Sequence, residues 1–118
     1  MSGIKQKKGR YGELLAKQFL RRRGFRIVAE NWTCKCGEID LIVRRGREWR
    51  FVEVKYRTNT EYGFPEEAIT ETKLRHIKQS AELFLLRLKR PPKHYQIDVV
   101  SILKNGQNKP DFHWIVAV

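Results

Sequence analysis

Side chains that could perform hydrolytic chemistry are concentrated in two short runs near the middle of the chain. Residues 37–40 (GEID) and residues 52–55 (VEVK) both alternate charged with apolar side chains. Carboxylates are ligands that Mg²⁺ prefers, with waters and a substrate phosphate as its further ligands. The combination of Asp40, Glu53 and Lys55 therefore makes these runs a candidate site for a divalent metal and a phosphate.

The segment between the two runs predicts a β-hairpin that brings them together. Both runs alternate in the manner of strands, and Gly46-Arg47 has glycine where a type II′ turn requires it. With that turn, or with a symmetric four-residue loop, residue i pairs with residue 93 − i, so Asp40 lies opposite Glu53 and Lys55 shares their face. Opposed Cβ atoms are about 5 Å apart, so the two carboxylates repel unless a metal, a shared proton or a lysine compensates. A divalent cation, Mg²⁺ or Mn²⁺, held by Asp40 and Glu53 is the simplest resolution.

A salt-bridge ladder on a wet sheet face is the alternative interpretation. It would be formed by five charged residues, Glu38, Asp40, Glu53, Lys55 and Arg57. The alternation places three apolar side chains on this same face, Ile42, Trp49 and Phe51, and three on the other face, Ile39, Leu41 and Val43. Charged groups beside a core need compensation, which favours the metal site, although charge pairs are common on strands. The residues alone leave both interpretations open.

The charge of the chain is strongly positive and unevenly distributed. The 118 residues include 25 Lys and Arg against 13 Asp and Glu, for a formal net charge of +12. Residues 1–26 carry net +8 and residues 73–93 net +6, whereas residues 27–72 carry net −2. Basic clusters neutralise phosphates, so we predict a nucleic acid as the partner, with a merely well-solvated surface as the alternative. The candidate contacts to backbone phosphates are Arg21, Arg22, Arg23, Arg57, Lys73 and Arg75.

The length suits a single domain over residues 1–118, in which we expect residues 1–9 to form a mobile basic arm. No apolar run approaches the ~20 residues that cross a bilayer, so we expect a cytoplasmic protein that does not bind a membrane. Cys34 and Cys36 are one residue apart. A disulfide between them would close a strained ring, and a zinc site would need a second pair of ligands, so we predict neither.

Apolar periodicity predicts an α/β domain with the order αβββαββ and a central mixed sheet of five strands flanked by helices. The first helix is expected from about Arg10 to Arg23, with Gly24 as its cap. Strands are expected over 25–29, 38–44, 49–57, 95–103 and 112–118, and loops over 31–37 and 62–65. A helical turn is expected at 65–67, and a longer apolar helix ends before Pro91. We expect Trp32, Trp49 and Trp114 to pack rather than to stack on bases.

Several runs, spread over nearly the whole chain, resemble the YraN family of uncharacterised bacterial proteins. They are Gly12-Glu13, Asn31, residues 37–42 (GEIDLI), residues 51–55 (FVEVK) with Arg57, Gly63, Lys73, Ala81 and residues 98–100 (DVV). The sequence departs from the usual pattern at Thr33 and at residues 114–118. The YraN family in turn resembles the PD-(D/E)xK nuclease superfamily, which includes archaeal Holliday-junction resolvases and restriction endonucleases.

This resemblance implies a restriction-endonuclease-like fold and a metal-dependent nuclease that hydrolyses DNA with structural selectivity or weak sequence specificity. Asp40 is similar to the first metal-binding acid of the motif, Glu53 to the second, and Lys55 to its lysine; a strand carbonyl near Val54 would complete the set. Glu13 resembles the helix-borne acid of some resolvases, which would assist a second metal or position the water. A resolvase-like activity calls for a homodimer.

Other functions remain open. Glu13 is also a residue type that the helix dipole favours in a first turn, and Arg21 to Arg23 are also typical of a last turn. The protein could be a non-catalytic nucleic-acid-binding protein that retains the nuclease fold, or a scaffold partner in DNA repair or translation. The presence of Asp40, Glu53 and Lys55 together favours the nuclease, because a pure binder gains little from carboxylates that face phosphates.

Overall fold

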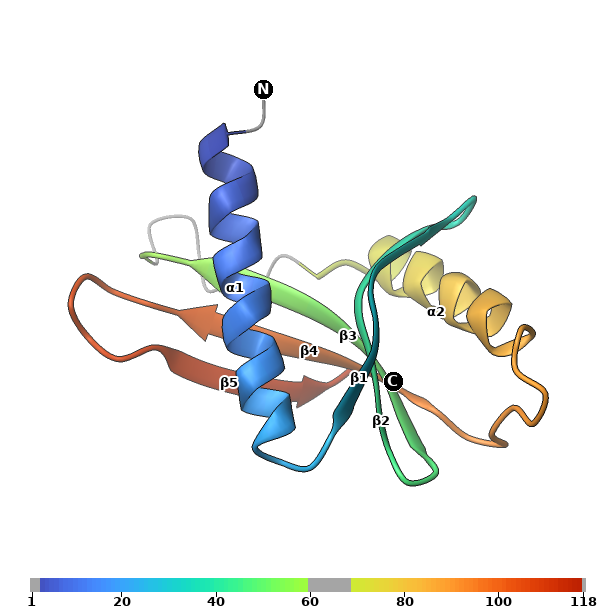
Figure 1. Cartoon of the computed structure of the whole chain (residues 1–118). Coiled ribbons are helices and arrows are strands. Elements are labelled where there is room, and N and C mark those ends of the chain that lie inside the picture. Colours follow the sequence, from blue (N-terminus) through green and yellow to red (C-terminus); the bar gives the residue numbers. More distant parts are fainter. Residues whose placement is uncertain (1–2, 60–68, 118) are drawn as a thin grey trace.

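The structure, a computed structural model, describes residues 3–59 and 69–117 (Figure 1). Its elements are α1 (Gly3–Arg21), β1 (Arg26–Cys34), β2 (Gly37–Arg45), β3 (Glu48–Arg57), α2 (Glu71–Leu85), β4 (Gln96–Leu103) and β5 (Asp111–Val116). The five strands form one sheet in chain order; β3 and β4 are parallel and the other neighbours antiparallel. The predicted order αβββαββ and the mixed five-stranded sheet are confirmed.

The two helices cover opposite faces of the sheet. Phe51 lies in a buried cluster with residues of α2, whereas its neighbour Val52 lies in a second cluster with Ala16 and Leu20 of α1. Successive strand residues point to opposite faces, so β3 is covered on both sides. The connection through α2 also explains why β3 and β4 are parallel, since parallel neighbours require a crossover.

Both helices have sequence signals at their ends. Gly24, with φ of 89°, follows the last turn of α1 as the predicted cap. Thr70 caps α2, because its side-chain Oγ1 accepts a hydrogen bond from the Lys73 N–H at 3.1 Å. The first helix begins at Gly3 rather than near Arg10. The mobility predicted for residues 1–9 stays a prediction.

Two predictions about the hairpin of β1 and β2 were wrong. The predicted loop over 31–37 is strand as far as Cys34, because β1 pairs with β2 as far as Cys34 and Gly37. Ile39 packs with Ile42 under α2 instead of sharing a face with Leu41. The alternation fails because a register shift and the positive φ of Asn31 bend β1, and its partner β2 turns with it toward α2.

The remaining boundaries differ by a few residues. The helix predicted to end before Pro91 ends at Leu85, and the last strand ends at Val116. The predictions for residues 62–65 and 65–67 lie outside the described residues. Within the described parts of the chain, no helix is long and apolar enough to cross a membrane.

Candidate active site

The β2–β3 hairpin has the predicted register. Its paired residues run from Arg45 opposite Glu48 to Leu41 opposite Val52, and every pair obeys the 93 − i rule. The turn is Gly46-Arg47, and Gly46 has a φ of 60°, as the first central position of a type II′ turn requires. The same register, continued by one residue beyond the Leu41–Val52 pair, places Asp40 beside Glu53 at the end of the paired segment.

Asp40 is fixed to the backbone of β3. Its Oδ2 accepts a hydrogen bond from the Val54 N–H at 2.8 Å. A carboxylate thus satisfies a strand N–H group beyond the last paired residues of the two strands. This contact orients the Asp40 side chain beside the neighbouring residue of β3, Glu53.

Glu53 is the most unusual titratable group of the site. Its side chain is buried, with 4% of the residue exposed, and it lies within hydrogen-bond reach of Asp40. Burial and then the Asp40 charge raise the pKa of Glu53 to about 7. Two carboxyl groups that meet out of water favour a shared proton or a cation between them.

Two lysines partly compensate this charge. The Nζ atom of Lys55 lies 3.9 Å from Glu53 Oε1, and that of Lys73 lies 3.3 Å from the same oxygen. Burial lowers the pKa of Lys55, and its side chain is only 16% exposed. Burial opposes the charged form of Lys73 as well, but the Glu53 carboxylate raises the Lys73 pKa above its ordinary value. The Lys73 side chain is 42% exposed, so it lies on the solvent side of the Glu53 carboxylate.

The acid of α1, Glu13, lies close enough to Asp40 to feel its charge. Glu13 Oε1 accepts a hydrogen bond from Asn31 Nδ2 at 3.0 Å. Partial burial raises the pKa of Glu13 against the effect of this hydrogen bond, and the charge of Asp40 adds to the rise. Gly12 permits the approach of α1, because a Cβ atom at this position would lie 2.7 Å from Tyr56 Cβ on β3.

The other predicted residues lie outside this group. Glu38 is exposed and pairs with Thr33 on β1, and its charge helps to raise the pKa of Glu13. Arg57 is exposed and donates to the carbonyl of Tyr56, although its charge helps to lower the pKa of Lys55. The described residues therefore form no five-member ladder. The exposed predicted phosphate contacts are Arg21, Arg22 and Arg23 at the end of α1 and Arg75 on α2.

Lys73 is the residue whose place the sequence analysis missed. It was assigned to backbone phosphates, but its ammonium group lies against the buried carboxylate. The N-cap signal at Thr70 places Lys73 in the first turn of α2. That signal could have located Lys73 in the helix, but not the contact between the helix and Glu53.

The donor set of the site fits a hard divalent cation. Asp40 and Glu53 supply carboxylate oxygens, and Mg²⁺ or Mn²⁺ is held through one or two carboxylates with water and substrate phosphate as further ligands. Residues 3–59 and 69–117 contain no group of three or more His, Cys, Asp and Glu side chains that could hold a metal. With only two protein carboxylates, water and substrate phosphate would have to supply the remaining ligands.

Comparison with known proteins agrees with the resemblance. The sequence model of the uncharacterised protein family UPF0102, which is the YraN family, matches residues 12–102. The chain belongs to this family. A UPF0102 protein of Caldicellulosiruptor saccharolyticus is 43% identical over 105 residues, which are 89% of each chain. One of Nocardia farcinica is 43% identical over 116 residues, and one of Vibrio campbellii is 41% identical over 113 residues. The match to the Nocardia protein covers 98% of this chain and 91% of the relative. The match to the Vibrio protein covers 94% of this chain and 90% of the relative.

The region shared with the UPF0102 family contains the whole candidate site. The match begins at Gly12, next to Glu13, and ends at Ile102, in β4. The edge strand β5 lies beyond it, as does the predicted departure at residues 114–118. The site therefore belongs to the part of the fold that defines the UPF0102 family.

Proposed function

We propose that this UPF0102 protein is a metal-dependent nuclease that hydrolyses phosphodiester bonds of DNA. The observation that carries the proposal is the meeting of Asp40 and Glu53 carboxyl groups with Lys55 Nζ at 3.9 Å from Glu53 Oε1. A sheet face that only had to pack would not gain from two carboxylates in contact, because they repel. A phosphodiesterase gains from them, since they hold a cation against the scissile phosphate.

Each residue of the site has a role in this chemistry. Asp40 and Glu53 would hold Mg²⁺ or Mn²⁺, and the bound ion supplies positive charge for the phosphoryl oxygens. The Val54 N–H keeps the Asp40 carboxylate in one orientation. The burial that lowers the pKa of Lys55 suits it to accept a proton from the attacking water or to orient that water.

Two further residues complete the site in this proposal. The Lys73 side chain is partly exposed beside Glu53 and positively charged, so it would contact the phosphate group of the bound substrate. Glu13, held by Asn31, positions the water or assists a second metal. Arg57 and Arg75 are exposed and suit contacts with neighbouring phosphates. Such contacts position the nucleic acid without reading bases, which agrees with structure-selective or weakly specific cleavage. A resolvase-like cleavage of two strands at symmetric positions would call for a homodimer.

One observation favours a non-catalytic nucleic-acid-binding protein. Lys55 and Lys73 already lie within 4 Å of Glu53, so part of its charge is compensated without a metal. Yet Glu53 still has its pKa raised to about 7, which means that the two lysines do not offset burial and Asp40. The part of the Glu53 charge that the lysines leave uncompensated favours the nuclease.

A cleavage panel tests the proposal. Labelled branched, single-stranded and duplex DNA are incubated with the protein in Mg²⁺, Mn²⁺ or EDTA. We expect cleavage of at least one substrate with metal and none in EDTA. Asp40→Asn and Glu53→Gln should reduce the rate by about 10²-fold or more. Glu38→Gln, which removes an exposed carboxylate from the same strand, is the matched control and should retain the rate. Binding of DNA without cleavage under every condition would favour the non-catalytic alternative.

A further inference from the structure

Six exposed arginines surround the β2–β3 turn, at the opposite end of the hairpin from the carboxylates. We call this surface the arginine end; it consists of Arg21, Arg22, Arg23, Arg26, Arg44 and Arg47. Arg26 and Arg44 are paired across β1 and β2. Figure 1 shows the last turn of α1 at the same end of the molecule as the β2–β3 turn.

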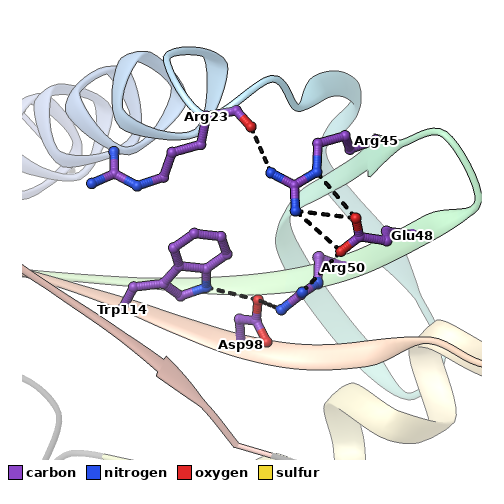
Figure 2. A network of polar contacts seen from close by, with 6 residues as sticks. All are labelled: Arg23, Arg45, Glu48, Arg50, Asp98 and Trp114. Carbon is purple, nitrogen blue, oxygen red and sulfur yellow. Dashed lines mark hydrogen bonds and ion pairs between the residues drawn. The ribbon is translucent and has the colours of Figure 1, made fainter.

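A network of polar contacts holds this end in place (Figure 2). Arg45 donates to the carbonyl of Arg23 at 2.7 Å and to Glu48 at 3.1 Å, which ties the end of α1 to the hairpin. Arg50 joins Glu48 at 3.1 Å to the buried Asp98 at 2.9 Å. Trp114 Nε1 donates to the same Asp98 oxygen at 2.7 Å. The backbone segments that carry the arginine end are therefore tied to each other and to the core.

The positive charge of this surface is not compensated by the protein itself. Glu48 is the only acidic residue of segments 21–26 and 44–50. Hydrogen bonds from Arg50 and Arg45 lower the pKa of Glu48. The negative charge of Glu48 is therefore already paired with these two arginines. The side chains of Arg22, Arg26 and Arg47 form no hydrogen bond or ion pair within the described parts of the chain.

The residue types indicate which ligand fits this surface. All six are arginine, whose planar guanidinium binds phosphate oxygens in a bidentate manner. The aromatic rings nearby are not free for base stacking: Phe25 and Trp49 are buried, and Phe19 lies 3.5 Å below the Arg23 guanidinium. Proteins that bind single strands use exposed rings as stacking platforms, so this surface suits the backbone of a duplex better.

We propose that the arginine end binds the sugar–phosphate backbone of a double helix at a site separate from the Asp40–Glu53 carboxylates. Six residue-to-residue steps of extended chain lead from Arg47 to Glu53, which corresponds to about 20 Å along the hairpin. That distance equals about six base-pair steps of duplex DNA. The inference concerns binding alone, so it goes beyond the proposed cleavage and does not depend on it.

Binding of a labelled duplex by the full chain, followed by fluorescence anisotropy in EDTA, tests the inference. The test variant carries Arg22→Gln, Arg26→Gln and Arg47→Gln, whose side chains have no partner to lose. The matched control removes three exposed lysines on the α2 side of the molecule, through Lys78→Gln, Lys89→Gln and Lys93→Gln. We expect at least tenfold weaker binding for the arginine variant and less than threefold for the control. Removal of three phosphate contacts should also lower the slope of log K against log salt by about 2.7.

Three further outcomes decide the matter. Replacement of the same three arginines by lysine should keep the salt slope, because it retains their charge. Equal losses in the arginine and control variants would mean that net charge alone attracts DNA, and would overturn the proposal. A preference for phosphatidylglycerol-containing vesicles over the duplex would also overturn it. Because cleavage is not scored, an inactive protein with a normal arginine end would refute only the proposed nuclease.

Discussion

The buried Glu53 carboxyl group predicts how the stability of the metal-free protein depends on pH. Its pKa is about 7 in the fold, against 4.5 for the free side chain. The folded protein therefore holds this proton more tightly than the unfolded chain does. The associated stability is fully present below pH 4.5 and is lost as the pH rises through about 7. A difference of about 2.5 pKa units corresponds to about 3 kcal/mol.

Thermal unfolding in EDTA between pH 5 and pH 8.5 measures this effect. For a domain of this size, 3 kcal/mol corresponds to about 10 °C in Tm. Other groups titrate over the same range, so the informative quantity is the difference between the wild type and Glu53→Gln. The glutamine variant has no proton to lose at this position. We therefore expect its Tm to rise relative to the wild type by about 10 °C between the two pH values.

A matched variant separates this effect from ordinary surface titration. Glu38→Gln removes an exposed carboxylate from β2 and should follow the wild type over the whole range. If the Glu53→Gln and wild-type curves ran parallel, the buried carboxyl group would have no raised pKa. The electrostatic argument for the candidate site would then be refuted.

Three other perturbations follow from the same geometry. At pH 8, Mg²⁺ or Mn²⁺ at a hundredfold excess over its Kd should stabilise the wild type by about 2.7 kcal/mol in thermal melts and leave Asp40→Asn unchanged. Lys73→Met removes the cation 3.3 Å from Glu53 Oε1, so we expect tighter Mn²⁺ binding by calorimetry, by about tenfold; unchanged or weaker binding would contradict this competition. Gly12→Ala should cost about 1–3 kcal/mol in urea unfolding, because its Cβ would lie 2.7 Å from Tyr56 Cβ; a neutral effect would mean that α1 shifts freely.

The part of the site that was predictable from the sequence is the part that local geometry determines. The β2–β3 register depends only on the alternation of two neighbouring strands and on a turn with Gly46 at its first central position. A hairpin with these features has one pairing that keeps its apolar residues buried. This is why the meeting of Asp40 and Glu53 was predictable from the sequence.

The contacts that sequence analysis missed join segments far apart in the chain. Lys73 reaches Glu53 across the connection between β3 and α2, and Arg50 reaches Asp98 across 48 residues. Alternation also assumes a straight strand, and it failed at Ile39, where β2 follows the bend of β1. Neither the docking of a helix nor the bend of a strand is encoded in the spacing of a single run of residues.

The energetics of Glu53 connect the fold to the proposed chemistry. At neutral pH its ionisation in the core costs folding free energy, since burial and Asp40 both oppose the charged form. A glutamine of similar shape would avoid that cost, so packing alone gives no reason for a carboxylate here. In the proposed function a divalent cation would reverse the balance, because it would bind the ionised pair and would be lost when either acid is neutralised. Glu53 therefore destabilises the metal-free fold under the conditions in which it would hold a metal most tightly. The same substitution, Glu53→Gln, should raise Tm in EDTA at pH 8.5 and reduce the cleavage rate in Mg²⁺ by about 10²-fold or more, whereas a buried carboxylate without a metal role would produce only the first change.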